Sequence, residues 1–257
     1  MIRALLFDLG GTLHTVRHSE ESRRTFCTRL LQILEERGIV LPLSPEALGS
    51  MLSVNAEEYK HWSEQSLREL PQPEIWADWY LRGLGIKPEQ LAPFAEDLSF
   101  FYDRERVINT PRPRLKETME ELHAMGIRLG IISNIISTTL VPFVLEEYGI
   151  ADLMECTVMS SAEGIRKPDP RIFEIAMRKM DLTAAETGYV GDTISRDVLG
   201  SRNAGLGLAV RIDNPSIAHR DAAFIGQPDA PREDFLIREL DELPAIIRKV
   251  NGILPET

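Results

Sequence analysis

The fold is decided by Phe7-Asp8-Leu9-Gly10-Gly11-Thr12-Leu13, a stretch near the start of the chain. The apolar residues from Ala4 to Phe7, with Leu9, predict a short buried strand, and Asp8 stands where that strand ends. The two glycines allow a sharp turn and let a ligand approach the backbone closely. Alone, the stretch fits an ordinary strand and Asp-Gly turn. Three later segments favour a functional role, because ligands of α/β sheets bind at strand carboxyl ends.

The overall composition is that of an ordinary globular protein with an acidic surface. A chain of 257 residues is long enough for one full core and an inserted domain. Its formal net charge of −11 argues against general binding to nucleic acid or to an anionic membrane. An acidic enzyme can still bind an anion through a metal ion and a few local donors. We therefore expect no nucleic-acid and no membrane partner.

The cysteines and the terminal segments predict a cytoplasmic protein. Cys27 and Cys156 are far apart and do not form a metal-ligand spacing, so both are expected to be reduced packing residues. No apolar run is long enough to cross a membrane. The first residues lack the layout of a signal peptide, because Ile2 to Leu6 belongs to the first strand.

From His14 to about Asn109 the pattern is helical, with no convincing strand. Apolar spacing and helix-start residues predict about four helices. One carries Phe26 to Leu34 on one face and ends near Gly38, and the others begin at Ser44-Pro45-Glu46 or cover Pro73–Leu84 and Pro88–Tyr102. Most of the aromatic residues here are expected to form a core. The prediction is a helical-bundle cap domain, residues 15–109, inserted after the first strand.

After Pro113, strands and helices alternate, which predicts an α/β fold with a doubly wound, Rossmann-like parallel sheet. The expected strands cover residues 127–132, 155–159, 189–190, 207–212 and 235–237, and the expected helices include residues 115–125, 169–180, 202–204 and 243–250. Residues 214–232 are polar and are predicted to be a surface loop. Residues 1–14 and 110–257 would form the core domain.

Polar residues follow three of the buried strands, at Asp8, at Ser133-Asn134 and at Gly191-Asp192, and Lys167 lies in a loop ahead of a helix. In a parallel sheet these strand ends open on one edge. The set suits phosphoryl transfer. Asp8 and Asp192 can share Mg²⁺, Ser133 and backbone N–H groups can hold phosphoryl oxygens, and Lys167 can offset the charge. A carboxylate can act as nucleophile and form an aspartyl-phosphate.

Together these motifs resemble the haloacid dehalogenase superfamily, in the branch with a helical cap after the first strand. The four matching motifs occur in order, as Asp8-Leu9-Gly10-Gly11-Thr12, Ser133-Asn134, Lys167-Pro168 and Gly191-Asp192-Thr193-Ile194-Ser195-Arg196-Asp197. Each alone is weak, and all four together are specific. The resemblance implies a Mg²⁺-dependent phosphatase acting on a small phosphorylated metabolite.

The same resemblance implies a role for each motif residue. Asp8 would be the nucleophile, and the metal ligands would be Asp8, the Gly10 carbonyl, Asp192 and, directly or through water, Asp197. Ser133, Asn134, the Gly11 amide and Lys167 would bind phosphate, with Thr12 bracing the loop. The structural alternatives are a solvated loop lysine for Lys167 and a helix cap for Asp197.

One position departs from the family pattern. Phosphatases of this family usually carry a second Asp two residues after the nucleophile, as general acid and base, and this chain has Gly10 there. A general acid contributes typically about 10² to 10⁴-fold. Either the leaving group needs little protonation, or another group serves, with His14 and His18 the nearest candidates, or turnover is slow. Both histidines could equally be solvent-facing residues at a hinge.

Other functions stay open. Carbon–halogen hydrolysis is favoured by Gly10 and disfavoured by the apparent metal site, and a mutase would need the missing base. A carbon–phosphorus hydrolase would need a cap lysine such as Lys60, although Lys60, His61 and Lys87 are expected on the surface. A binding or regulatory protein on the same fold is the non-enzyme alternative. An aromatic-rich cap could also supply a homodimer surface.

Overall fold

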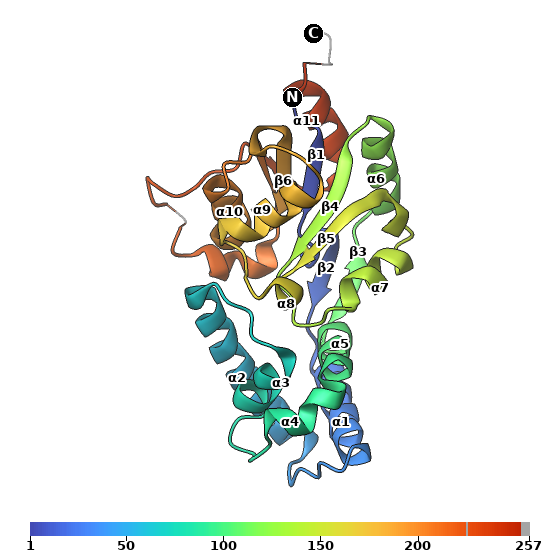
Figure 1. The fold of residues 1–257 in the computed structure, drawn as a ribbon, viewed down its shortest axis with the longest axis vertical. Coiled ribbons are helices and arrows are strands. Elements are labelled where there is room, and N and C mark those ends of the chain that lie inside the picture. The colour runs from blue at the N-terminus through green and yellow to red at the C-terminus, as the bar shows by residue number, and fades with distance from the viewer. Residues whose placement is uncertain (225, 253–257) are drawn as a thin grey trace.

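The computed structural model describes residues 1–224 and 226–252. At its centre is a six-stranded sheet in the order β5-β4-β1-β6-β7-β8, and all neighbouring strands are parallel (Figure 1). The strands are β1 (Ala4–Phe7), β4 (Arg128–Ser133), β5 (Met154–Met159), β6 (Thr187–Gly191), β7 (Leu208–Ile212) and β8 (Phe235–Ile237). The predicted doubly wound α/β sheet is confirmed.

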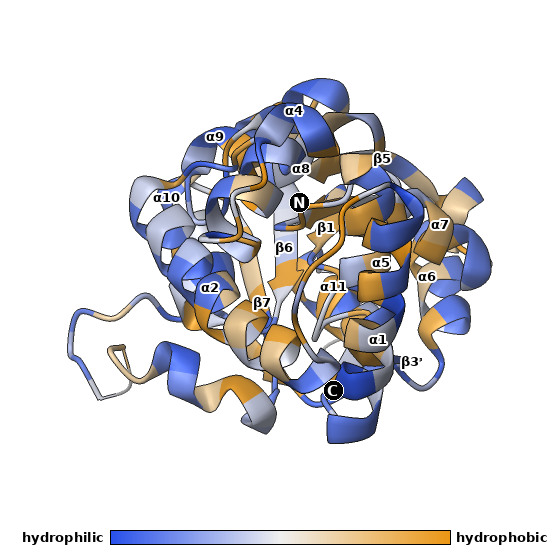
Figure 2. Ribbon diagram, turned by 90° about the horizontal axis from the view of Figure 1, so that it is seen from below, coloured by the Kyte–Doolittle hydropathy of each residue, from blue (hydrophilic) through white to orange (hydrophobic). Residues whose placement is uncertain are grey.

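Helices cover both faces of this sheet, because its strands are apolar on both sides. In β1, Leu5 and Phe7 face one core, and Ala4 and Leu6 face another. The first core is closed by α6 (Leu115–Ala124), α7 (Leu140–Glu147) and α11 (Leu243–Val250), and the second by α9 (Pro170–Lys179). In Figure 2 the hydrophobic colours gather in the strands and on the helix sides that face them. Two short helices complete this part, α8 (Ser160–Glu163) and α10 (Leu199–Asn203).

The order of the strands determines where a ligand can bind. From β1 the sheet extends through β4 to β5 on one side, and through β6 and β7 to β8 on the other. The chain reverses direction along the sheet at β1, and such switch points open a crevice at the carboxyl ends of the strands. Asp8 directly follows β1 at this point.

Residues 20–105 form a helical block with its own core, below the sheet in Figure 1. It comprises α1 (Glu20–Glu36), α2 (Pro45–Ser66), α3 (Gln72–Glu74), a π-helix (Ile75–Tyr80), α4 (Pro88–Leu91), a 3₁₀ turn (Ala92–Phe94) and α5 (Ala95–Glu105). Ser19 and Ser44 accept backbone N–H bonds as N-caps of α1 and α2. Tyr59 and Trp76 are fully buried in this core, as expected for most of the aromatic residues.

Two strands were not predicted from the sequence. β2 (His14–Arg17) and β3 (Ile108–Pro111) pair antiparallel at the two crossings between the sheet and the helical block. The expectation of no strand between His14 and Asn109 is therefore wrong at both ends. Each strand is only four residues long, with two exposed residues, and is too short and polar to show an alternating apolar pattern.

The polar segment after β7 is also more ordered than a surface loop. Residues 215–221 form a 3₁₀ helix, Pro215–Asp221, and Asp221 at its end is buried. The loop prediction for residues 214–232 is wrong for this part, and residue 225 lies outside the described residues. Short 3₁₀ turns at Ala151–Leu153, Ala184–Glu186 and Leu240–Glu242 and a π-helix at Ile194–Val198 complete the fold. Among the described helices, none combines the length and the hydropathy that crossing a bilayer requires.

Candidate active site

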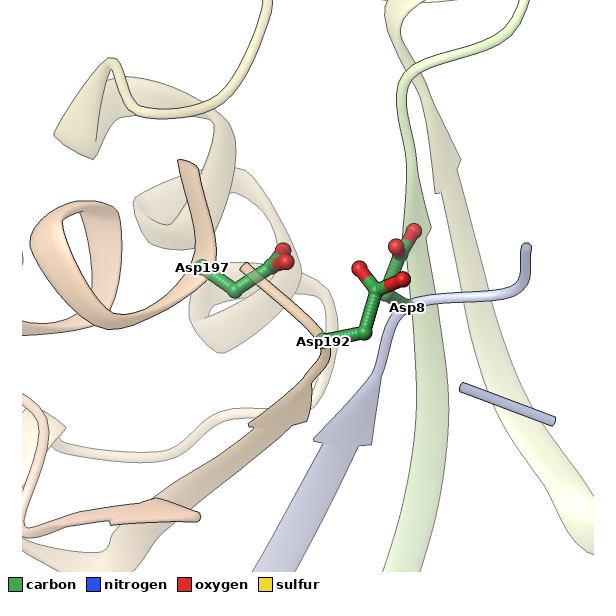
Figure 3. A group of neighbouring side chains, drawn as sticks. All are labelled: Asp8, Asp192 and Asp197. Atoms are coloured by element: carbon green, nitrogen blue, oxygen red, sulfur yellow. The ribbon is translucent and has the colours of Figure 1, made fainter. Parts of the chain in front are cut away.

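Three buried carboxylates meet at the carboxyl edge of the sheet (Figure 3). Asp8 follows β1, Asp192 follows β6, and Asp197 lies in the π-helix that comes next. One oxygen of each lies within 4.8 Å of an oxygen of the others. Neighbouring parallel strands therefore bring Asp8 and Asp192 together, as the sequence predicted.

Lys167 lies among these carboxylates and is almost completely buried. Its Nζ lies 2.8 Å from Asp8 Oδ1 and 2.8 Å from Asp197 Oδ1. It also donates to the Tyr189 hydroxyl at 2.7 Å. A solvated loop lysine is excluded by this burial, and the ammonium is positioned to offset charge at Asp8.

The three carboxylates have different proton affinities. Burial raises the pKa of Asp8, although Lys167 opposes the shift. Burial, with the charges of Asp197 and Asp8, raises the pKa of Asp192 to about 7. For Asp197 burial acts in the same direction, but Lys167 and Arg196 outweigh it and lower the pKa to about 2. The charged form of Asp197 is thus satisfied within the protein, whereas Asp8 and Asp192 lack enough positive charge.

The loops that carry Asn134 and Lys167 are held together by a two-sided clamp. The Asn134 side chain donates to the Lys167 carbonyl at 3.0 Å and accepts from the Lys167 N–H at 2.9 Å. Ser133 is the last residue of β4, next to β1, and is buried. The amide side chain of Asn134 therefore fixes the lysine backbone, while Ser133 lies at the strand end beside Asp8.

Gly11 is required by the close approach of Asp192. A Cβ on residue 11 would collide with the Asp192 carboxylate, and the backbone φ there is +87°. The Gly11 N–H donates to the His14 carbonyl at 2.8 Å, so in this structure it is engaged within the loop and not open to phosphate. The Thr12 side chain is fully buried in the same loop.

The donor set fits a hard cation such as Mg²⁺. Asp192 Oδ1 is buried and has no hydrogen-bond partner among the described residues, while Asn214 donates to Oδ2 at 2.8 Å. An unpartnered buried carboxylate oxygen is unfavourable unless a cation completes it. Both oxygens of Asp197 are already occupied, Oδ1 by Lys167 and Oδ2 by the Thr193 N–H at 3.0 Å. The open oxygens thus lie on Asp192 and Asp8, not on Asp197.

His14 lies beside the position where the second Asp of the family would stand. A Cβ on Gly10 would be 3.8 Å from His14 Nε2. His14 is buried, and burial with the charges of Arg104 and Arg112 lowers its pKa to about 4. Its Nδ1 lies 3.0 Å from the Tyr148 hydroxyl. The solvent-facing alternative is therefore wrong for His14, because β2 carries the ring inward; His18 is exposed.

Acidic side chains of the helical block bind the loops of the site. Glu69 forms a buried ion pair with Arg166 and accepts from Ser160 Oγ at 2.6 Å. Asp103 accepts from the Ile136 and Ser137 N–H groups, at 3.2 and 3.0 Å. The block therefore contacts both the loop after β4 and the loop that leads to Lys167. Lys60, by contrast, pairs with Glu57 at 2.8 Å on α2.

The sequence did not single out several residues that complete the site. Tyr189 was expected only as part of a strand, and its hydroxyl contacts Lys167. Asn214 and Asp221 lie in the segment predicted to be a loop. Asn214 bonds Asp192, and Asp221 accepts from the Ile194 N–H at 2.7 Å. For Asn214, the one signal in the sequence was its position two residues after β7, at the same edge of the sheet as the other site residues.

The family model for haloacid dehalogenase-like hydrolases matches residues 2–205. Two curated relatives are phosphatases. The glyceraldehyde 3-phosphate phosphatase of Methanopyrus kandleri is 28% identical over 97% of this chain and 99% of its own. The phosphoglycolate phosphatase of Vibrio parahaemolyticus is 32% identical over 52% of this chain and 55% of its own.

A solved structure shares the whole architecture. It is a 2-haloacid dehalogenase from Pseudomonas syringae pv. Tomato DC3000, with a TM-score of 0.63, and the match covers 97% of this chain and 100% of that one. Only 21% of the residues are identical, so the likeness concerns the fold alone.

Proposed function

Because the chain belongs to the haloacid dehalogenase-like hydrolase family, we propose that it is a Mg²⁺-dependent phosphatase of small phosphorylated metabolites. The observation that carries the proposal is the meeting of Asp8, Asp192 and Lys167 in one buried cluster. Relatives named for glyceraldehyde 3-phosphate and for phosphoglycolate support a small phosphate ester as the substrate class.

In the first step an Asp8 oxygen attacks the phosphorus atom. A bond forms between Asp8 and phosphorus, and the bond from phosphorus to the ester oxygen breaks, leaving an aspartyl-phosphate and an alkoxide that takes up a proton. Lys167, 2.8 Å from Asp8 Oδ1, offsets the negative charge that gathers on the phosphoryl oxygens. Ser133 and backbone N–H groups of the loops are proposed to orient those oxygens.

In the second step a water molecule attacks the same phosphorus atom. The bond between phosphorus and Asp8 breaks, the carboxylate is restored, and the proton of the water leaves with inorganic phosphate or to solvent. No carboxylate at residue 10 is present to take that proton. We propose that this step limits turnover, since Asp192 and Asp197 are engaged with Asn214 and Lys167, and Asp192 would also hold the cation.

A bound Mg²⁺ would supply positive charge to the phosphoryl oxygens and to the nucleophilic carboxylate. Asp8, the Gly10 carbonyl and Asp192 are proposed to hold it. Asp197 is proposed to act on the ion through water and, more directly, to hold Lys167. Its low pKa of about 2 supports this part, because it stays charged at any working pH.

The helical block is proposed to act as a cap over the site. Its acidic contacts to the loops at residues 136–137 and 160–166 support a closed arrangement that excludes bulk water from Asp8. The proposed cap corresponds to residues 15–109 of the sequence prediction, joined to the core through β2 and β3.

Phosphate release from a metabolite panel and from p-nitrophenyl phosphate tests the function, with Mg²⁺ and with EDTA. We expect turnover that requires Mg²⁺ and that Asp8→Asn abolishes, while Asp152→Asn, at an exposed aspartate, retains it. Retained activity in Asp8→Asn would refute the nucleophile. Binding of beryllium fluoride to Asp8, read by a rise in melting temperature, gives a readout that is independent of turnover.

Carbon–halogen hydrolysis is the second candidate, and Gly10 is the observation that favours it. That reaction also forms an ester on an Asp, and needs no second Asp two residues later. Chloride release from a 2-haloacid in the presence of EDTA, with no phosphate release from any ester, would replace the phosphatase proposal.

A further inference from the structure

Three arginines near the site form no ion pair within 4.0 Å in the described part of the chain. Arg106, Arg196 and Arg220 form neither an ion pair nor a hydrogen bond there, and the Nε atom of each is buried without a partner. In a chain of net charge −11, carboxylates are plentiful, so guanidinium groups that are half-buried, with a buried Nε atom and no close ion pair, call for an explanation. By contrast, Arg166 is paired with Glu69.

The segment after β7 places two of them beside the carboxylate cluster. Asp221 accepts from the Ile194 and Ser195 N–H groups at 2.7 and 2.9 Å, which fixes the neighbouring Arg220 against the π-helix that contains Arg196. At the other end of the segment, Asn214 bonds Asp192 at 2.8 Å. Both ends of residues 214–221 are therefore tied to the site.

The third arginine lies at the crossing from the helical block. Arg106 follows α5, and its guanidinium carbon stacks 4.4 Å from the ring centre of Tyr102. Partial burial, with the charges of Arg106 and Arg220, lowers the pKa of His18 on the other crossing. Arg106 and Arg220 thus each lie close enough to His18 to disfavour its charged form.

Arg220 has no carboxylate at ion-pair distance in the described part of the chain. Burial, followed by repulsion from Arg196, lowers the pKa of Arg220. The nearest acids of the helical block, Glu57 and Glu64, are beyond ion-pair distance, and Glu57 is paired with Lys60. Asp192, Glu64 and Glu57 favour the charge of Arg220 from a distance, but they do not offset burial and Arg196.

We propose that Arg196 and Arg220, with Arg106 at the rim, form a subsite for a second anionic group of the substrate. The inference rests on the proposed phosphatase function and makes it more specific: the substrate class is a phosphate monoester that also carries a carboxylate or a second phosphate. Lys167 already serves the scissile phosphate, and Arg196 also acts on the carboxylates, so Arg220 is the guanidinium group most available to the other end of the molecule. Guanidinium groups suit both anions, because they can donate two parallel hydrogen bonds.

The test compares matched esters that differ in the second anion. One pair is 2-phosphoglycolate and 2-hydroxyethyl phosphate, and the other is fructose 1,6-bisphosphate and fructose 6-phosphate. The wild-type protein should prefer the more anionic member of one pair at least tenfold in kcat/KM, and the preferred pair identifies the second anion. Arg220→Gln should reduce that preference at least tenfold, mainly through KM, with partial recovery in Arg220→Lys.

Arg178→Gln is the matched control, because Arg178 is an exposed arginine on α9. It should leave the preference within twofold. A wild-type preference below twofold in both pairs, or one that Arg220→Gln leaves unaltered, would overturn the subsite while p-nitrophenyl phosphate hydrolysis upholds the phosphatase. If the wild-type protein hydrolysed none of these esters and no p-nitrophenyl phosphate, the proposed function would be overturned together with the subsite. Calorimetric binding of 2-phosphoglycolate and fructose 1,6-bisphosphate to Asp8→Asn, with and without Arg220→Gln, gives a second readout of the subsite.

Discussion

His14 faces Gly10, with its Nε2 lying 3.8 Å from the point at which a Cβ on residue 10 would stand. That distance is ordinary van der Waals contact, and Gly10 is outside the left-handed region of φ, so a side chain fits there without strain. We expect Gly10→Asp to fold and to raise kcat on alkyl phosphates by about 10² to 10⁴-fold, as a general acid typically does. Stopped assays on glycerol phosphate would measure it. An unchanged rate would mean that no acid is missing.

The same substitution should act differently on a good leaving group. Since p-nitrophenolate needs little protonation, Gly10→Asp should change its release far less than the release of an alkoxide. Gly10→Asn is the matched control, because it fills the same space and carries no titratable group. If both variants accelerated alkyl phosphates equally, the effect would be one of packing and not of proton transfer.

The substitution Gly11→Ala tests how closely the loop after β1 approaches Asp192. Gly11→Ala adds a Cβ that collides with the Asp192 carboxylate. It also places alanine at a φ of +87°, which is strained for any residue with a side chain. Gly83→Ala has nearly the same φ, +88°, with no atom within 4 Å of the new Cβ, so it isolates the backbone cost of about 1–2 kcal/mol. We expect Gly11→Ala to lose clearly more unfolding free energy than Gly83→Ala, and most of its activity. Equal losses in urea melts would contradict the collision.

Glu69 is expected to hold the helical block against the site. Its side chain is fully buried, and Glu69→Ala would leave Arg166 buried without its carboxylate, a loss of about 3–5 kcal/mol in comparable buried pairs. Glu58→Ala, which breaks the exposed pair with Arg82, should cost about 1 kcal/mol or less. Urea unfolding measures both. Similar costs for the two variants would show that the Glu69 contact is not buried in solution.

Asp103 makes stability depend on pH. Burial, with the charge of Glu69 adding to it, raises its pKa from 3.8 to about 7, while backbone N–H groups and Arg106 act in the opposite direction. Between about pH 4 and 7 the folded protein keeps a proton that the unfolded chain has lost, so the free energy of unfolding falls as pH rises through this window. Asp103→Asn should flatten the difference between pH 5 and pH 8. Asp97→Asn, at an exposed site on the same helix, should leave it as in the wild type.

Mg²⁺ should stabilise the folded state by relieving repulsion among the carboxylates. A ligand at about a hundred times its Kd adds about 2.7 kcal/mol to the unfolding free energy, which is readily seen as a rise in melting temperature. Asp192→Asn should remove most of this rise, and Asp213→Asn, at an exposed aspartate, should retain it. A rise that survives in Asp192→Asn would place the ion elsewhere.

The sheet and its buried carboxylates were predictable because local pattern and topology agree there. An apolar strand followed by Asp8 or Asp192 reveals both the strand and its functional end, and parallel pairing then brings the two residues together. Lys167 followed from its place in an ordered set of motifs. The strands and the carboxylates that follow them depend on residues that are adjacent in the sequence, whereas Lys167 depends on the order of all four motifs.

The features that were missed depend on partners far away in the chain. β2 and β3 are stabilised by pairing with each other across about ninety intervening residues, and neither has an apolar alternation of its own. Asp221 was assigned to a loop because the groups that donate to its carboxylate, the N–H groups of Ile194 and Ser195, lie more than twenty residues earlier in the sequence. The burial of Glu69 likewise depends on Arg166.

The pairing of Arg17 with Ile108 has a consequence for how such chains diversify. The polypeptide leaves the sheet domain and returns to it through two strand ends that lie side by side, so the gap to be bridged is no wider than a hairpin turn. Whatever is spliced between these ends, from a two-residue turn to a full bundle, imposes no new distance on the catalytic half of the molecule. Inserted domains of different size can therefore be exchanged at this junction, in evolution or by engineering, without changing the distance between the two strand ends.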